Sequence, residues 1–102
     1  MRFLAVVVMA LLAVPAAAMD EDDQRYCDTL DNIAEAVMER RQDGMTHREM
    51  YDRMDADSES LVSKIIDEAY DKPRYQTDEM KEKTVQEFRN RWYGICRRGM
   101  SD

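Results

Sequence analysis

The sequence predicts an all-α fold, a small bundle of about four helices whose first and last members run antiparallel and are joined by one disulfide. Three observations support this prediction. Apolar side chains recur with the 3.6-residue period of an α-helix in four segments. The period-two alternation of β-branched residues that is typical of strands is almost absent. The two cysteines, Cys27 and Cys96, lie in the first and the last of the four segments.

The first helix is predicted over residues 23–43. Its apolar stripe includes Cys27, Leu30, Ala34, Val37 and Met38, with Arg41 at its end. Gly44 follows at the position where a left-handed residue often ends a helix.

A second, short helix is predicted to begin at Thr46, because Thr46 and Glu49 have the spacing of a capping box. Its apolar side consists of Met50, Tyr51 and Met54.

A break over residues 55–58 offers several N-cap residues for a third helix. The apolar stripe of this helix is Leu61, Val62, Ile65, Ile66, Ala69 and Tyr70. It should end near Asp71 or Lys72, because Pro73 disfavours helical backbone angles in the residue before it. Thr77 is the predicted N-cap of the fourth helix, and Gly99 is expected to end it. The stripe of the fourth helix is Met80, Thr84, Val85, Phe88, Trp92, Ile95 and Cys96.

Residues 1–18 have the features of a cleavable secretory signal peptide. One arginine precedes an apolar run of roughly 12 residues, which is too short to cross a bilayer, and small residues precede the predicted cleavage site. We therefore expect residues 19–102 to form a single helical domain that is periplasmic or secreted and has no stable membrane anchor after cleavage.

Cys27 and Cys96 are the only cysteines of the chain, and disulfides form and persist in exported proteins. We expect these two residues to pair. Redox catalysis and metal ligation by thiolates are the alternatives, and the absence of a Cys-x-x-Cys motif argues against both. A crosslink that encloses about 70 residues contributes roughly 4 kcal/mol by chain-entropy arithmetic. That amount is comparable with the whole stability of a small domain.

The charge of the chain makes nucleic acid an improbable partner. The full sequence has 22 acidic and 15 basic residues and a net charge of −7, and the acids are concentrated in residues 20–59. Basic residues outnumber acids in residues 81–98. Oppositely charged segments are therefore expected to pack side by side. The alternative is an acidic face that attracts a cationic partner.

The sequence predicts a non-enzymatic protein without a cofactor. His47 is the only histidine, it lies in the first turn of a short helix, and no serine or cysteine nearby has the features of an activated nucleophile. His47, Met50 and Met54 share one helical face and form a weak candidate set for Cu(I). Methionine at helical spacing is more often part of a core.

Tyr70, Arg74 and Tyr75 flank Pro73 in the connection between the last two helices. Tyrosine and arginine are common anchors of protein interfaces. These three residues are therefore our candidates for binding a partner, which we expect to be another exported protein. The alternative is that the tyrosines cover the end of the bundle while Arg74 pairs with a carboxylate.

The chain resembles a family of small exported two-cysteine helical proteins of proteobacteria and their prophages. The resemblance rests on Cys27, on Ala34-x-x-Val37-Met38-x-x-Arg41-Gln42-x-Gly44, on Ala69-Tyr70-x-x-Pro73-Arg74-Tyr75 and on Phe88-x-x-x-x-Tyr93-x-x-Cys96. It implies a periplasmic helical protein and supplies no catalytic or ligand residues.

A looser similarity links the chain to periplasmic acid-stress chaperones, whose cysteines lie closer together in sequence. This similarity implies a client binder as an alternative function. Protonation of carboxylates at low pH would expose its apolar stripes while the disulfide prevents complete unfolding.

Overall fold

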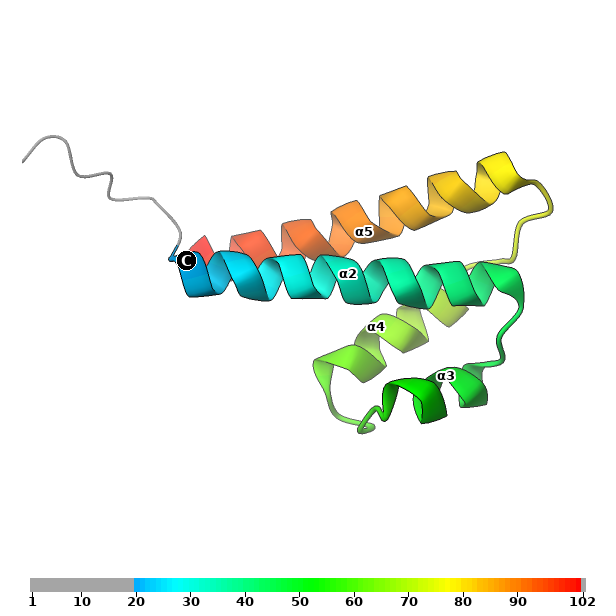
Figure 1. The fold of residues 1–102 in the computed structure, drawn as a ribbon, viewed down its shortest axis with the longest axis horizontal. Helices are drawn as coiled ribbons and strands as arrows, with labels where there is room; N and C mark the ends of the chain where they lie inside the picture. The colour runs from blue at the N-terminus through cyan, green and yellow to red at the C-terminus, as the bar shows by residue number, and fades with distance from the viewer. Residues whose placement is uncertain (1–19, 102) are drawn as a thin grey trace, which may run out of the picture.

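The computed structural model of the chain describes residues 20–101, apart from the side chains of residues 100 and 101. The predicted signal peptide lies outside the described residues. Four helices make up the described part: α2 (Glu21–Asp43), α3 (His47–Met54), α4 (Leu61–Tyr70) and α5 (Asp78–Ser101). Figure 1 shows α5 antiparallel to α2 along one side, and the shorter α3 and α4 against another side of α2. The all-α prediction is confirmed, since residues 20–101 contain no strand.

The helix ends follow the capping residues of the sequence. Thr46 and Glu49 form the predicted capping box of α3, and Thr77 Oγ1 accepts the backbone N–H of Met80 at 3.2 Å. Gly44 ends α2 with a φ of 105°. The glycine occupies a left-handed conformation that strains residues with a Cβ atom.

Two predicted boundaries were wrong. The first helix begins at Glu21 rather than at residue 23, because the side chain of Asp20 serves as the N-cap and accepts the backbone N–H of Asp22. Gly99 does not end α5, which continues to Ser101. A glycine ends a helix where its backbone becomes left-handed, and Gly44 is the only glycine with a positive φ in the described part.

The core lies around α2, which packs against each of the other three helices. Met38, Met50, Ile65 and Ile66 are completely buried. The remaining buried apolar residues are Cys27, Leu30, Ala34, Val37, Ala69, Val85, Phe88, Trp92 and Cys96. Almost all of the apolar stripe positions expected for the first, third and fourth helices contribute to this core or to its edge. Met80 is an exception, with 38% of its surface exposed.

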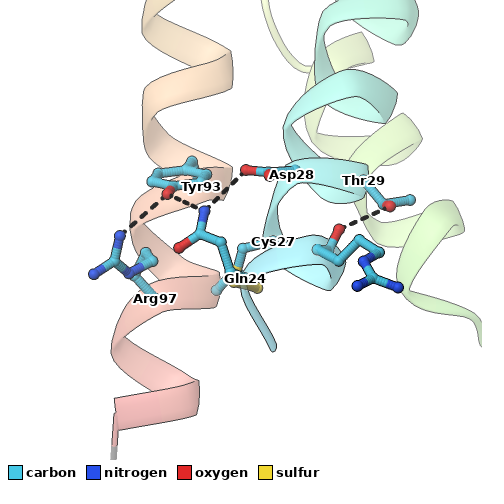
Figure 2. Close-up of a disulfide and its surroundings, with 8 residues drawn as sticks. Gln24, Cys27, Asp28, Thr29, Tyr93 and Arg97 are labelled. Carbon is cyan, nitrogen blue, oxygen red and sulfur yellow. Dashed lines mark hydrogen bonds between the residues drawn. A yellow bond between two sulfur atoms is a disulfide. The ribbon is translucent and has the colours of Figure 1, made fainter. Parts of the chain in front are cut away.

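A disulfide between Cys27 and Cys96 joins the beginning of α2 to the end of α5, which confirms the predicted pairing. Figure 2 shows the polar side chains that surround it. The Gln24 amide Nε2 donates to the hydroxyl of Tyr93 at 2.8 Å, and Arg97 donates to the same oxygen at 3.1 Å. Because Cys27 is fully buried and Cys96 is 6% exposed, the surroundings of the disulfide favour a structural role.

Oppositely charged side chains also join the helices. Arg89 of α5 binds the carboxylates of Asp31 and Glu35 of α2, each at 2.9 Å. Arg91 of α5 binds Glu68 of α4 through two hydrogen bonds of 2.6 and 2.8 Å. The expectation that the acidic residues 20–59 and the basic residues 81–98 pack side by side is met at Arg89. Within residues 20–101, no helix is both long and apolar enough to cross a membrane.

Candidate interaction surface at the end of α2

The connection from α4 to α5 passes the C-terminal end of α2 (Figure 1), and a buried glutamine ties the two together. Gln42 is 1% exposed. Its amide Nε2 donates to the carbonyl oxygen of Pro73 at 2.9 Å, and its Oε1 accepts the backbone N–H of Tyr75 at 2.8 Å. Both ends of one amide therefore hold the loop in place. Our sequence reasoning assigned no structural role to Gln42, although its position four residues after Met38 places a polar side chain on the apolar stripe.

Two arginines hold the same junction through backbone carbonyl groups. Arg41 donates from Nε and Nη2 to the oxygen of Lys72, at 3.2 and 2.9 Å. Arg74 donates from Nε to the oxygen of Gln42 at 3.2 Å. Its guanidinium lies against Gly44, where a Cβ atom would stand only 3.2 Å from Arg74 Nη2. Cations are stabilised at this end of a helix because the helix dipole is negative there.

Aromatic rings continue this arrangement over α3 and α4. The guanidinium carbon of Arg41 lies 4.8 Å from the centre of the Tyr70 ring. The ring of His47 stacks on the ring of Tyr70, with 4.5 Å between the two ring centroids and 2° between the ring planes. Tyr51 lies 5.4 Å from His47 in a tilted orientation. Arginine, tyrosine and histidine thus form a continuous stack that begins at α2 and ends on α3.

Hydrogen bonds fix both ends of the stack. The Tyr70 hydroxyl contacts the carbonyl oxygen of Met45 at 2.5 Å, and burial raises the pKa of this hydroxyl. Asp67 Oδ1 accepts the hydroxyl proton of Tyr51 at 2.5 Å and lies 2.9 Å from His47 Nε2. The bonds to Tyr51 and His47 hold the pKa of Asp67 below its usual value. The bond to Asp67 raises the pKa of Tyr51.

We call the set Arg41, His47, Tyr51, Tyr70 and Arg74 the clasp surface. Arg74 and His47 are exposed, and the other three residues are half-buried. Because neighbouring groups hold each side chain, the five residues are kept in one arrangement. The guanidinium groups of Arg41 and Arg74 can donate hydrogen bonds to a partner.

The structure brings two of the three predicted partner-binding residues, Tyr70 and Arg74, onto the clasp surface. Tyr75 lies at the same junction, where it is half-buried and contributes its backbone N–H to Gln42. The Tyr70 hydroxyl bonds to carbonyl groups of the α2–α3 loop, and its ring contacts Arg41 and His47. These contacts fit the alternative of a tyrosine that covers the end of the bundle, and its role in binding a partner stays a prediction. Arg74 binds a backbone carbonyl in place of the carboxylate considered as an alternative.

The weak candidate set for Cu(I) is divided between surface and core. Met50 is completely buried and Met54 packs at the edge of the core. His47 lies on the clasp surface with its Nε2 on Asp67. Residues 20–101 hold no group of three or more His, Cys, Asp or Glu side chains placed to bind a metal ion.

A charged cleft opens between the C-terminal half of α2 and the N-terminal half of α5, with a volume of about 990 Å³. Six carboxylates and three cationic groups line it. They are Glu35, Glu39, Asp43, Asp78, Glu79 and Glu82, with Arg40, Lys81 and Lys83. Pockets for small ligands are mostly apolar, and apolar side chains contribute little to these walls.

No family model, no curated protein and no solved structure matches the chain. The resemblance to small exported proteins therefore remains a prediction. Fold and surface together define a class, an all-α bundle whose outer helices are joined by a disulfide and which presents a preorganised stack of arginine and aromatic side chains.

Proposed function

We propose that this protein is a non-enzymatic, periplasmic or secreted module that binds another exported protein through the clasp surface. Export is supported by the signal-peptide features of residues 1–18 and by the disulfide, which suits an oxidising compartment. The observation that carries the binding proposal is the stack of Arg41, Tyr70 and His47.

Tyrosine and arginine are enriched among the residues that supply most of the binding energy in protein interfaces. Binding is weakened when side chains must be ordered on association, at about 0.5–1.5 kcal/mol for each long side chain. On the clasp surface that ordering is already complete, because Lys72, Met45 and Asp67 hold the members of the stack. A partner can therefore gain affinity from a small area.

Site-specific photo-crosslinking tests this proposal. A photo-reactive amino acid at Asp71, an exposed position beside Tyr70, should capture a defined partner from the cell envelope or culture fluid of the producing organism. The same group at Asn32, exposed on α2, is the matched control and should capture none. The two changes His47→Ala and Arg74→Ala should abolish capture at Asp71 without loss of the helical circular dichroism spectrum.

Capture from both positions, or capture that is unchanged by His47→Ala with Arg74→Ala, would contradict the proposal. The alternative of an acid-stress chaperone predicts another pattern, namely many captured proteins at acid pH and none at neutral pH. The experiment is therefore carried out at both pH values.

A further inference from the structure

The chain is acidic overall, whereas the segments that carry the clasp surface have no net charge. Residues 40–53 and 67–74, which include all five clasp residues, contain six arginines and lysines and six acids, while the whole chain has a net charge of −7. The basic residues are Arg40, Arg41, Arg48, Arg53, Lys72 and Arg74. An anionic partner is therefore repelled less at the clasp end than by the rest of the chain.

The positive charges at this end are not neutralised by ion pairs. Arg89 and Arg91 elsewhere on the molecule are bound by carboxylates. Arg41 and Arg74 instead donate to backbone carbonyl groups, which carry no net charge. Within residues 20–101, none of the six basic residues of the clasp end forms an ion pair.

Each of the two guanidinium groups keeps unused donors in a fixed position. Arg41 uses Nε and Nη2, and Arg74 uses Nε alone. Among the residues that the structure describes, Nη1 of Arg41 and both Nη groups of Arg74 have no hydrogen-bond partner. A guanidinium group has a planar fork of N–H donors that matches a carboxylate. An anchored fork loses less freedom when it binds than a mobile lysine does.

We infer that the clasp surface recognises an acidic segment of a partner protein, whose carboxylates bind the free N–H groups of Arg41 and Arg74. This inference rests on the proposed function and assigns the chemistry of its partner. An anionic membrane surface fits less well, because membrane-binding faces combine cations with inserted apolar side chains. The exposed large apolar residues of the described part, Tyr26 and Met80, are not members of the clasp surface.

A nuclear magnetic resonance titration of the oxidised chain tests the inference. The probe is a blocked peptide of five Glu-Gly repeats, compared with the same peptide made of Gln-Gly repeats. The glutamate peptide should shift the Nε–Hε signals of Arg41 and Arg74 and leave those of Arg89 and Arg91 unchanged, because the latter already bind carboxylates. The glutamine peptide should shift none of them.

Arg74→Lys keeps the charge and removes the fork. It should weaken binding of the glutamate peptide about tenfold, the effect of one charge-assisted hydrogen bond. Arg25→Lys, at an exposed arginine that pairs with Glu21 on the first turn of α2, is the matched control and should leave the affinity unchanged. Equal affinities of the Arg74→Lys and Arg25→Lys proteins, or equal shifts by the two peptides, would overturn the inference.

Two further probes separate other anions from an acidic segment. Inorganic phosphate that shifts the same signals at the same concentration of negative charge would indicate a site for small anions. Cosedimentation with phosphatidylglycerol vesicles that Arg74→Lys abolishes would indicate a membrane surface. Either result would overturn the inference.

A crosslinked partner whose capture is insensitive to Arg74→Lys would overturn it while leaving the proposed function intact. Peptide binding without a crosslinked partner would count against the proposed function alone.

Discussion

At the scale of single residues, Gln42 shows how one polar group positions a loop. It lies where the helical period calls for an apolar residue, and it is nonetheless 1% exposed. Both of its polar ends are satisfied by the loop after α4. Burial of an amide is tolerated when its hydrogen bonds are made and is costly when they are lost.

Replacement of Gln42 by alanine should therefore destabilise the protein by about 2 kcal/mol, because the Pro73 oxygen and the Tyr75 N–H lose their partner. Urea unfolding followed by circular dichroism measures this change. Gln86→Ala, at an exposed glutamine of α5, is the control and should alter the free energy of unfolding by less than about 0.5 kcal/mol. Equal effects of the two substitutions would mean that the Gln42 hydrogen bonds do not hold the loop.

At the scale of helices, the two glycines near helix ends differ in their backbone. Gly44 terminates α2 in a left-handed conformation with the Arg74 guanidinium against it. Gly99 lies inside α5, and a Cβ atom there would have no neighbour within 4 Å. A glycine that needs its conformational freedom and one that does not should respond in opposite ways to the same substitution.

Gly44→Ala should destabilise the protein by about 1–2 kcal/mol, the cost of a left-handed conformation in a residue with a Cβ atom. Gly99→Ala should stabilise it by up to about 0.5 kcal/mol, because alanine has the higher helix propensity. Thermal unfolding of both variants and of the parent protein measures these changes: the midpoint should decrease for Gly44→Ala and increase for Gly99→Ala. A stabilising Gly44→Ala would show that the turn after α2 can be rebuilt without a left-handed residue.

At the scale of the whole molecule, covalent and ionic links join helices that are distant in sequence. The disulfide spans 69 residues and ties α2 to α5. Arg91 ties α5 to α4 through Glu68. A chain of this size buries only a modest core, so the disulfide forms a large part of its stability. The half-exposed pair of Arg91 and Glu68 contributes less.

Cys27→Ser with Cys96→Ser should destabilise the chain by about 4 kcal/mol, since the unfolded chain loses a crosslink over most of its length. Urea unfolding of the double variant beside the oxidised protein measures the difference. Reduction of the parent protein by dithiothreitol is the second route to the same comparison and should give a similar loss. A loss below about 1 kcal/mol would indicate that helix packing alone holds α2 against α5.

The free energy of unfolding should decrease in acid, because protonation of the Glu68 carboxylate removes its pair with Arg91. The hydrogen bonds from Arg91 hold the pKa of Glu68 below its usual value of 4.5. The unfolded chain therefore binds this proton first as the pH decreases. The contribution of Glu68 is fully present above pH 4.5 and is lost as the pH falls through the lower pKa of the folded state.

Glu68→Gln should accordingly lower stability at pH 7 and reduce the further loss between pH 5 and pH 3. Urea unfolding at several pH values measures both quantities. Glu87→Gln is the control, because Glu87 is exposed and forms no ion pair in the described part of the chain. If Glu68→Gln and Glu87→Gln gave the same pH dependence, the pair with Arg91 would not contribute to acid sensitivity.

The sequence by itself determined the elements of this protein and how its ends meet. Helical periodicity, capping residues and the two cysteines can be read directly from the sequence. They were sufficient to predict four helices and the antiparallel arrangement of the first and last. The candidate site was predicted in part, because proline, tyrosine and arginine in one loop identify it as a possible interface.

Only the tertiary structure decided how that interface is built. The stack requires Arg41, His47 and Tyr70 from three helices, and the loop is held by Gln42, which is 31 residues from Pro73. A helical period reports which face of a helix is apolar, but it does not report which helix end lies beside which loop. That proximity follows from packing of the whole chain, so neither the hydrogen-bond partners of Gln42 nor the role of His47 beside Tyr70 could be inferred from local pattern.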